Sequence, residues 1–483
     1  MFWPSAWRVK DENTRNCWGY TFQWTPEHCT AEALHPLKYT YDKLAEDCLE
    51  RIDTISPPED ASLPRNQSRE HKSSEADKGE TRDPAPKRDL YALLRDHAEG
   101  DELLSKLWSD INRIPEWVDW DQIQRGQDVF YRYGGPALTG LAYQSLLGGM
   151  GGNRVVETLA RTGGFSTKVA KQRMYETTQH ILQCTNSLES IKPGGPGHVS
   201  SVRVRFLHAA VRRRIMKLAT QRAGYFDTEK LGIPINDLDC IATICTFSAT
   251  LIWLSFPRQG LLLRRQETED YIALWRLIAH YMGTPTDVFE TPEKTKAMWE
   301  SLLISEIDPS ETSTILANNV INSLAGQPPS YVSRDFLCAG AHWLNGHELA
   351  DRLGIERPTA WYVALMAGQC VFFMALCYFY RSVPALDRRK IKNQALRRIF
   401  YAVIVEHKHG LGEATNFEFK YVPDYDVMTD MNVSKAGIVQ RSGVERRNFI
   451  SFLIASIAVS SVCWVSMKAV SSLTRTIVSS VSF

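Results

Sequence analysis

The chain has 483 residues, of which 44% are hydrophobic and 23% charged, enough for one large domain with a substantial core and appended segments. Its formal net charge of +1 comes from 56 basic and 55 acidic residues, so there is no overall field to attract a polyanion, and we expect no nucleic-acid partner. The ten cysteines are scattered without a C-x-x-C pair, and the first residues lack the basic-then-apolar pattern of a signal peptide. We therefore expect reduced thiols in a cytosol-facing protein.

The first half of the chain changes composition twice. Residues 1–55 are rich in aromatic side chains and are predicted to be ordered. Residues 56–88 contain almost no apolar side chain, cannot offset the entropy cost of ordering, and are predicted to form a disordered insert. From residue 89 to about 390, apolar residues recur three and four positions apart, and strand-like alternation is scarce. This pattern predicts a large all-α domain.

Two uncharged apolar segments raise the question of a membrane. Residues 359–380 are long enough to cross a bilayer but contain Gln369 and three tyrosines, and we favour a buried core helix. Residues 449–467 follow Arg446 and Arg447 and lie close to the C-terminus, which favours a single C-terminal anchor with a cytosolic main domain. Such an anchor is typical of the endoplasmic reticulum or a related internal membrane. The C-terminal part is therefore divided into an extension (391–447), a transmembrane anchor (448–468) and a tail (469–483).

His208 is the most informative residue, because it places an imidazole in an otherwise apolar helical stripe. Two interpretations are open: a hydrogen-bonded core histidine, or the iron ligand of a haem-binding helix whose nearby arginines meet the carboxylates of the cofactor. The stripe consists of Val204, Leu207, His208, Val211, Ile215 and Leu218, and the arginines are Arg203, Arg205, Arg212, Arg213 and Arg214.

A second predicted helix starts after Ser166, a plausible N-cap, and carries Arg173 and Thr177 four positions apart on a largely apolar face. These side chains are either pocket residues or a buried ion-pair partner and a hydroxyl bonded to its own backbone. Upstream, Glu157 lies on a short helix after a Gly-rich turn and is either a general base or the counter-ion of Arg173. Downstream, Thr243 lies on a buried helix capped by Asn236 and is a further candidate pocket residue.

Together, five stretches in order along the chain resemble the family of rubber oxygenases (latex clearing proteins) and the fungal endoplasmic-reticulum-bound oxygenases of the mpaB type. The resemblance covers about residues 117–386. The matching stretches are Trp117–Tyr133, Arg173–Thr177, Val202–Arg212, Pro234–Asp239 and Tyr271–Ala279.

The resemblance implies a helical domain with a globin-like core that holds one haem b, with His208 as the proximal iron ligand. It assigns Arg173 and Thr177 to the distal side of the haem and the proposed base to Glu157, and it matches Thr243 to a pocket position. Bacterial rubber oxygenases have a lysine that can cap the iron, and this chain has Glu176 there, which leaves the sixth ligand open.

The function implied by the resemblance is a haem-dependent oxygenase at a membrane. Such an enzyme uses dioxygen as co-substrate to oxidise or cleave a carbon–carbon double bond of an apolar substrate, here an isoprenoid or a lipid. Two alternatives stay open on sequence alone: a haem-binding sensor or carrier without turnover, and a cofactor-free membrane scaffold.

Overall fold

The computed structural model describes residues 10–58, 88–417 and 442–481, so nearly all of the predicted insert at 56–88 lies outside the described residues. Within those ranges the fold is all-α, as predicted, and its strands are one antiparallel hairpin, β1 (Thr14–Cys17) with β2 (Tyr20–Gln23). The described part of the N-terminal segment is ordered. It continues from the hairpin into α1 (Ala31–Leu34) and α2 (Lys43–Ile55).

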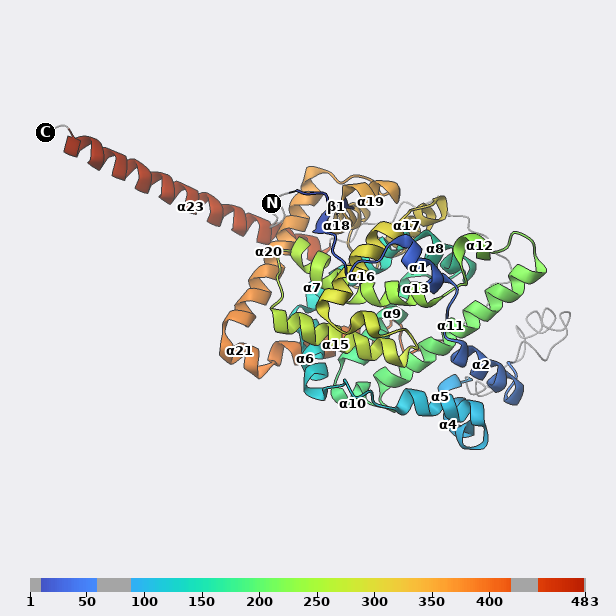
Figure 1. Ribbon diagram of the computed structural model, residues 1–483. Helices are drawn as coiled ribbons and strands as arrows, with labels where there is room; N and C mark the ends of the chain where they lie inside the picture. The colour runs from blue at the N-terminus through green and yellow to red at the C-terminus, as the bar shows by residue number, and fades with distance from the viewer. Residues whose placement is uncertain (1–9, 59–87, 418–441, 482–483) are drawn as a thin grey trace, which may run out of the picture.

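The domain is a thick cluster of helices rather than a layered fold (Figure 1). Helices α6 and α15 cross closely at Gly126, where an added Cβ would lie 2.3 Å from the backbone oxygen of Asp270. The helices of the domain are α4 (Leu90–His97), α5 (Glu102–Asn112), α6 (Trp120–Arg132), α7 (Gly134–Gly140), α8 (Asn153–Arg161), α9 (Ala170–Thr185), α10 (Leu188–Ile191), α11 (Pro196–Gln221), α12 (Thr228–Leu231), α13 (Asp237–Phe247), α14 (Phe256–Arg258), α15 (Arg265–Tyr281), α16 (Pro292–Ser305), α17 (Glu311–Leu324), α18 (Arg334–Asn345) and α19 (His347–Arg352).

The apolar core is divided into clusters that α9 joins. One cluster lies around α6, α13 and α15 and includes Ile181 and Leu182 of α9. The other lies around α8, α17 and α18 and includes Ala170 and Met174 from the beginning of the same helix. Helix α9 therefore runs through the middle of the domain, with its two ends in different clusters.

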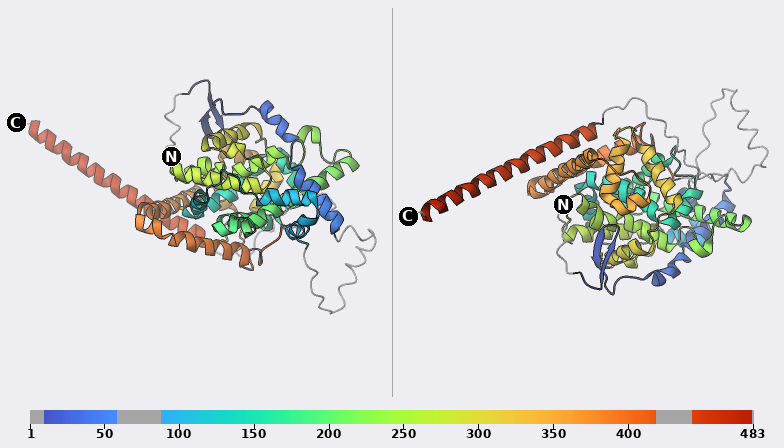
Figure 2. Two further views of the ribbon diagram at one scale, coloured as in Figure 1. Left: turned by 60° about the horizontal axis from the view of Figure 1, so that its bottom comes forward. Right: turned by 90° about the horizontal axis from the view of Figure 1, so that it is seen from above.

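Four further helices complete the chain: α20 (Ala360–Ser382), α21 (Pro384–Arg389), α22 (Ile391–Tyr401) and α23 (Gly443–Val481). Helix α23 contacts α20 near its start and then projects away from the domain, as two further views show (Figure 2). Among the described residues, three helical stretches are long and apolar enough to cross a membrane: Asp237–Arg258, Ala360–Ser382 and Gly443–Val470. The most apolar part of each stretch is 67%, 39% and 0% buried, respectively. Asp237–Arg258 therefore lies in the core, Ala360–Ser382 is partly covered, and the apolar part of Gly443–Val470 is uncovered.

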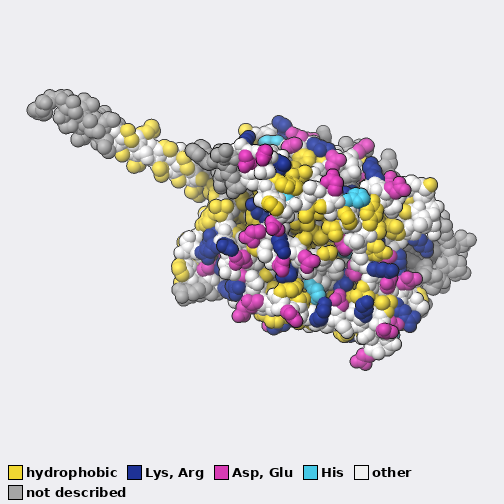
Figure 3. Space-filling model, in the orientation of Figure 1, with side chains coloured by type: hydrophobic (Ala, Val, Ile, Leu, Met, Phe, Trp, Pro, Cys, Tyr) yellow, Lys and Arg dark blue, Asp and Glu magenta, His cyan; other side chains and the backbone are white. Residues whose placement is uncertain are grey.

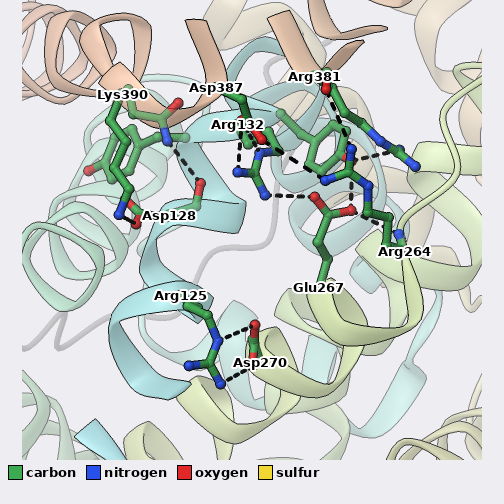
Figure 4. A network of polar contacts seen from close by, with 12 residues as sticks. Arg125, Asp128, Arg132, Arg264, Glu267, Asp270, Arg381, Asp387 and Lys390 are labelled. Carbon is green, nitrogen blue, oxygen red and sulfur yellow. Dashed lines mark hydrogen bonds and ion pairs between the residues drawn. The ribbon is translucent and has the colours of Figure 1, made fainter. Parts of the chain in front are cut away.

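A polar network ties the C-terminal helices to the domain (Figure 4). Arg132 of α6 binds Glu267 of α15 at 2.7 Å and Asp387 of α21 at 2.8 Å. On the same helix α6, Asp128 is 7% exposed at its side chain and pairs with Lys390 and with Arg397 of α22. Because buried charges are costly without partners, these pairs fix where α21 and α22 lie on α6.

Candidate active site

A cavity of about 350 Å³ lies between α8, α9, α11 and α13 and is lined mainly by apolar side chains. Its volume is within the roughly 300–1,000 Å³ typical of small-molecule sites. The polar and charged side chains on its wall are Ser145, Arg154, Thr158, Thr162, Arg173, Glu176, Thr177, His180, His208, Asp239, Thr243, Thr246 and Glu306. Four of the five predicted site residues, Arg173, Thr177, His208 and Thr243, are therefore brought together.

His208 faces this cavity from the middle of α11. Burial is the main cause that lowers its pKa to about 4, so the imidazole is neutral at pH 7. Among the hydrogen bonds of the described residues, none involves either ring nitrogen of His208. A neutral imidazole with an unused lone pair on an apolar cavity is a ready ligand for a metal or cofactor.

The arginines around His208 do not serve the cavity. Each of the four whose partners are resolved pairs with a carboxylate from the N-terminal helices, so α11 is attached to α2, α4 and α5. The pairs are Arg203 with Asp89, Arg205 with Asp42 and Asp110, Arg212 with Glu46, and Arg213 with Asp53. The interpretation that these arginines meet the carboxylates of a cofactor is wrong.

Helix α9 presents Arg173, Glu176 and Thr177 to the cavity. It begins at Ala170, not after Ser166 as predicted, and residues 166–169 form a turn that precedes it. Arg173 Nη1 donates to Glu176 Oε2 at 2.8 Å, and Thr177 Oγ1 donates to the Arg173 carbonyl at 3.1 Å. Arg173 therefore has its counter-ion three positions along the same helix, and the sequence alternative that paired it with Glu157 is wrong.

Glu157 is not among the residues that line the cavity. Its carboxylate accepts from Arg161 Nη1 at 2.7 Å, one helical turn along α8. The lining positions of α8 are Arg154, Val155, Thr158 and Leu159, which occupy another face of the helix. The predicted role of Glu157 as a base stays a prediction.

A buried acid cluster on the wall was not singled out from the sequence. Arg154 lies 2.8 Å from both Asp239 and Glu306, and all three side chains are nearly buried. Burial outweighs the attraction of Arg154 and raises the pKa of Asp239 to about 6. Thr243 Oγ1 donates to the backbone carbonyl of Asp239 at 2.7 Å, which fixes Thr243 beside this cluster.

His180 is a second cavity histidine that sequence reasoning missed. It lies on α9 seven residues after Arg173, a spacing of two helical turns that places both on one face. Its Nδ1 lies 3.0 Å from Ser200 Oγ, which itself donates to the Gly197 carbonyl, so unlike His208 it has a hydrogen-bond partner. Burial lowers its pKa to about 4 as well.

In the described part of the chain, the cavity wall has a free imidazole rather than a cluster of metal-ligating side chains. Across residues 10–58, 88–417 and 442–481, no three His, Cys, Asp or Glu side chains come together in a way that could hold an ion. Haem brings its own ring nitrogens and needs only an axial ligand from the protein, often one histidine. The free imidazole of His208 on an apolar wall fits that requirement.

The fold is similar to that of latex clearing protein. It matches the solved structure of latex clearing protein in the closed state with a TM-score of 0.52 over 75% of this chain and 91% of the other; at 18% identity this likeness concerns the fold alone. The chain belongs to the family of ER-bound oxygenase mpaB/B′ and rubber oxygenase, whose catalytic-domain model matches residues 131–377, about half of the chain.

Two curated relatives agree with this assignment. The rubber oxygenase of Streptomyces sp. (strain K30) is 22% identical over 292 residues, which cover 56% of this chain and 66% of that protein, just under two thirds of its length. The aurantioclavine synthase cnsA of Penicillium expansum is 58% identical over 33 residues, 7% of each chain. The matched part of this chain is thus an oxygenase catalytic domain.

Proposed function

We propose that the protein is a haem-dependent oxygenase that uses dioxygen to oxidise or cleave a carbon–carbon double bond of an apolar substrate, an isoprenoid or a lipid. The observation that carries this proposal is the neutral, unpartnered imidazole of His208 on the apolar cavity, with Arg173 and Thr177 on the same wall. Membership of the oxygenase family supports the reaction type.

Each residue has a separate task in this proposal. His208 holds the haem iron, and the bound haem supplies the redox centre at which dioxygen is activated. Arg173 donates hydrogen bonds and positive charge toward the reacting oxygen atoms, and Glu176 keeps its guanidinium oriented. The hydroxyl of Thr177 is already donated to a backbone carbonyl, so its oxygen is available to accept a hydrogen bond.

Proton removal from the substrate needs a base, and the resemblance assigns this role to Glu157. The carboxylates that line the cavity are Glu176, Asp239 and Glu306; Glu306 keeps two cationic partners, Arg154 and Lys38, so Glu176 and Asp239 are tested as alternatives. Comparing Glu157→Gln, Glu176→Gln and Asp239→Asn tests them: a variant that keeps haem and the wild-type rate is not the base, and loss of product in Glu176→Gln alone does not identify the base, because that variant also loses the counter-ion of Arg173. If all three turn over at the wild-type rate, none of them is the base.

We also propose that α23 anchors the protein in the endoplasmic reticulum or a related internal membrane, with the main domain in the cytosol. Within Gly443–Val470, an 18-residue window has a mean hydropathy of 2.0 and none of that window is buried, while Arg446 and Arg447 precede the apolar run. A C-terminal epitope should be protected from protease in microsomes while the domain is digested. Digestion of the epitope would refute this topology.

The absorption spectrum of the purified protein tests the haem assignment. The wild type should show a Soret band, His208→Ala should lose it, and His347→Ala, at an exposed histidine outside the cavity, should keep it. A band that survives His208→Ala but disappears in His180→Ala would move the ligand to α9. Absence of the band after expression with adequate iron and haem would refute the proposal and favour a cofactor-free scaffold. Haem binding without product from any isoprenoid or lipid alkene would favour a sensor or carrier.

A further inference from the structure

The outer face of α20 is apolar along its whole length. No charged residue occurs from Ala360 to Tyr380, while the inner face of the helix is buried through residues such as Leu365 and Phe373. At the two ends of the outer face, Trp361 is 51% and Phe379 is 59% exposed. Large exposed aromatic side chains in a continuous apolar surface mark a contact site rather than ordinary surface.

Further exposed apolar side chains occur beyond the C-terminal end of α20, where Arg381 lies beside them and donates to the Leu262 carbonyl. The backbone NH of Leu262, a residue 57% exposed, donates to Tyr378 Oη at 3.1 Å, which places Leu262 beside the end of α20. On the other side, Lys392 Nζ lies 5.7 Å from the ring centre of Tyr380, so the start of α22 adjoins the same end.

Helix α22 adds two exposed isoleucines that lie on one face of the helix. Ile391 and Ile399 are 59% and 53% exposed, and their spacing of eight places both on one face of the helix. We call the five residues Trp361, Phe379, Leu262, Ile391 and Ile399 the apolar strip.

Helices α20 and α22 both pack on the start of α7. Their inner faces rest on consecutive glycines at the start of α7: a Cβ on Gly134 would meet Leu396 and Phe400 of α22, and one on Gly135 would meet Phe373 of α20. In Figure 3, hydrophobic side chains gather where α20 meets the base of α23, on the side from which α23 departs.

The start of α23 is fixed to α20. A Cβ on Gly368 would lie 2.0 Å from the backbone oxygen of Asn448, so the two helices cross in close contact. Asn448 Nδ2 also donates to the side chain of Gln369 at 3.2 Å, and the ring of Phe449 lies 5.0 Å from that of Trp361. The direction of α23 is therefore coupled to the position of the apolar strip.

We propose that the apolar strip lies on the same lipid bilayer that α23 enters, so that the domain is held against the membrane by α20 and α22 as well as by its anchor. The proposal rests on the proposed anchoring by α23. A lipid surface is the occupant that fits, because an anchor rooted in the middle of α20 brings the bilayer next to the strip. Arg398, exposed beside Ile399, and Arg446, exposed at the start of α23, are placed to meet lipid headgroups.

The test places a fluorescent label at single positions of the full-length protein. Phe379→Cys and Ile391→Cys are made in a Cys463→Ser background and labelled with a nitrobenzoxadiazole maleimide. The wild-type Cys463, exposed in α23, reports the anchor. Ile114→Cys is the matched control, because Ile114 is an exposed isoleucine next to α5, on the far side of the domain from α20 (Figure 1). The background variant alone gives the residual labelling.

The labelled proteins are reconstituted into phosphatidylcholine–phosphatidylserine vesicles with and without shallow doxyl-labelled lipid. If the apolar strip lies on the bilayer, labels at 379 and 391 should lose fluorescence to a degree comparable with the label at Cys463, while the label at 114 should lose none. Quenching at Cys463 with none at 379 and 391 would overturn the strip and leave the anchor standing. Quenching at 379 and 391 without quenching at Cys463 would support the strip and overturn the anchor. A blue shift at 379 and 391 that doxyl lipid does not quench would overturn the proposal in favour of a second copy of the chain.

Discussion

Replacing Arg154 should destabilise the folded protein, because its guanidinium neutralises two carboxylates on the cavity wall. In Arg154→Met, the buried carboxylates Asp239 and Glu306 lose a guanidinium that lies 2.8 Å from each. Glu306 keeps Lys38 Nζ at 3.5 Å, whereas among the described residues Asp239 has no second ion-pair partner. Breaking a buried pair costs about 3–5 kcal/mol, and we expect the lower end of this range because only Asp239 is left without a cation.

The loss should depend on pH with a defined sign. The pKa of folded Asp239 is raised from 3.8 to about 6, so the folded state holds this proton more tightly than the unfolded state, and its contribution to stability falls as the pH rises from about 4 to about 6. Without Arg154 the pKa of Asp239 rises further. The free-energy difference between variant and wild type should therefore be small at pH 5, where Asp239 is protonated in both, and should grow above pH 6.

Thermal unfolding of the full-length protein in detergent at pH 5.0 and 7.5 measures how the stability loss of Arg154→Met depends on pH. We expect the melting temperature of Arg154→Met to fall by on the order of 5 °C at pH 7.5 and by much less at pH 5.0. Arg154→Lys should recover most of the loss. Arg95→Met removes an ion pair whose two side chains are more than half exposed and should change nothing measurable. An equal loss at both pH values would refute the reasoning, because it would show that the charge of Asp239 does not determine the cost.

Two glycine substitutions test the close helix crossings. Gly126→Ala should lower stability by about 1–3 kcal/mol, seen as a lower melting temperature, because its Cβ would lie 2.3 Å from the Asp270 carbonyl oxygen; Gly100→Ala, which meets nothing within 4 Å, is the control and should not lower it. Gly368→Ala should loosen the start of α23, because its Cβ would lie 2.0 Å from the Asn448 oxygen. Faster hydrogen–deuterium exchange in residues 443–453 with an unchanged melting temperature of the domain would confirm this, and unchanged exchange would contradict it.

The parts of the fold and site that follow a helical period could be predicted from the sequence. Apolar spacing predicted the all-α domain, and the same spacing placed His208 in its stripe and Arg173 and Thr177 on one face. The cap at Asn236 was also predictable, because its side chain accepts from the backbone NH of Asp239 and so starts α13, which carries Thr243 to the cavity. Such features depend on residues within a few turns of one another.

Features set by contacts distant in sequence could not be predicted. The arginines of α11 look like cofactor ligands in the sequence, but their carboxylate partners come from segments 95 to 166 positions away. The acid cluster joins Arg154, Asp239 and Glu306 from three separate helical regions, which no local pattern in the sequence connects. Tertiary packing also decided which face of α8 meets the cavity, and that face excludes Glu157.

A comparison of His208, which is partly buried, with the buried His180 and His198 shows why the role of His208 could not be assigned from the sequence. Sequence leaves open whether a histidine in an apolar setting is a hydrogen-bonded core residue or a ligand. His198 is the core case: its Nδ1 accepts from Gly194 N at 3.1 Å and its Nε2 donates to the Ile111 carbonyl at 2.9 Å, so both nitrogens are used. His180 uses Nδ1 on Ser200. For His208 no hydrogen bond is found to any described residue, although its side chain faces a cavity and burial keeps it neutral. His208 is only partly buried and its ring lies on the cavity wall, so its free nitrogen is open to whatever occupies the cavity.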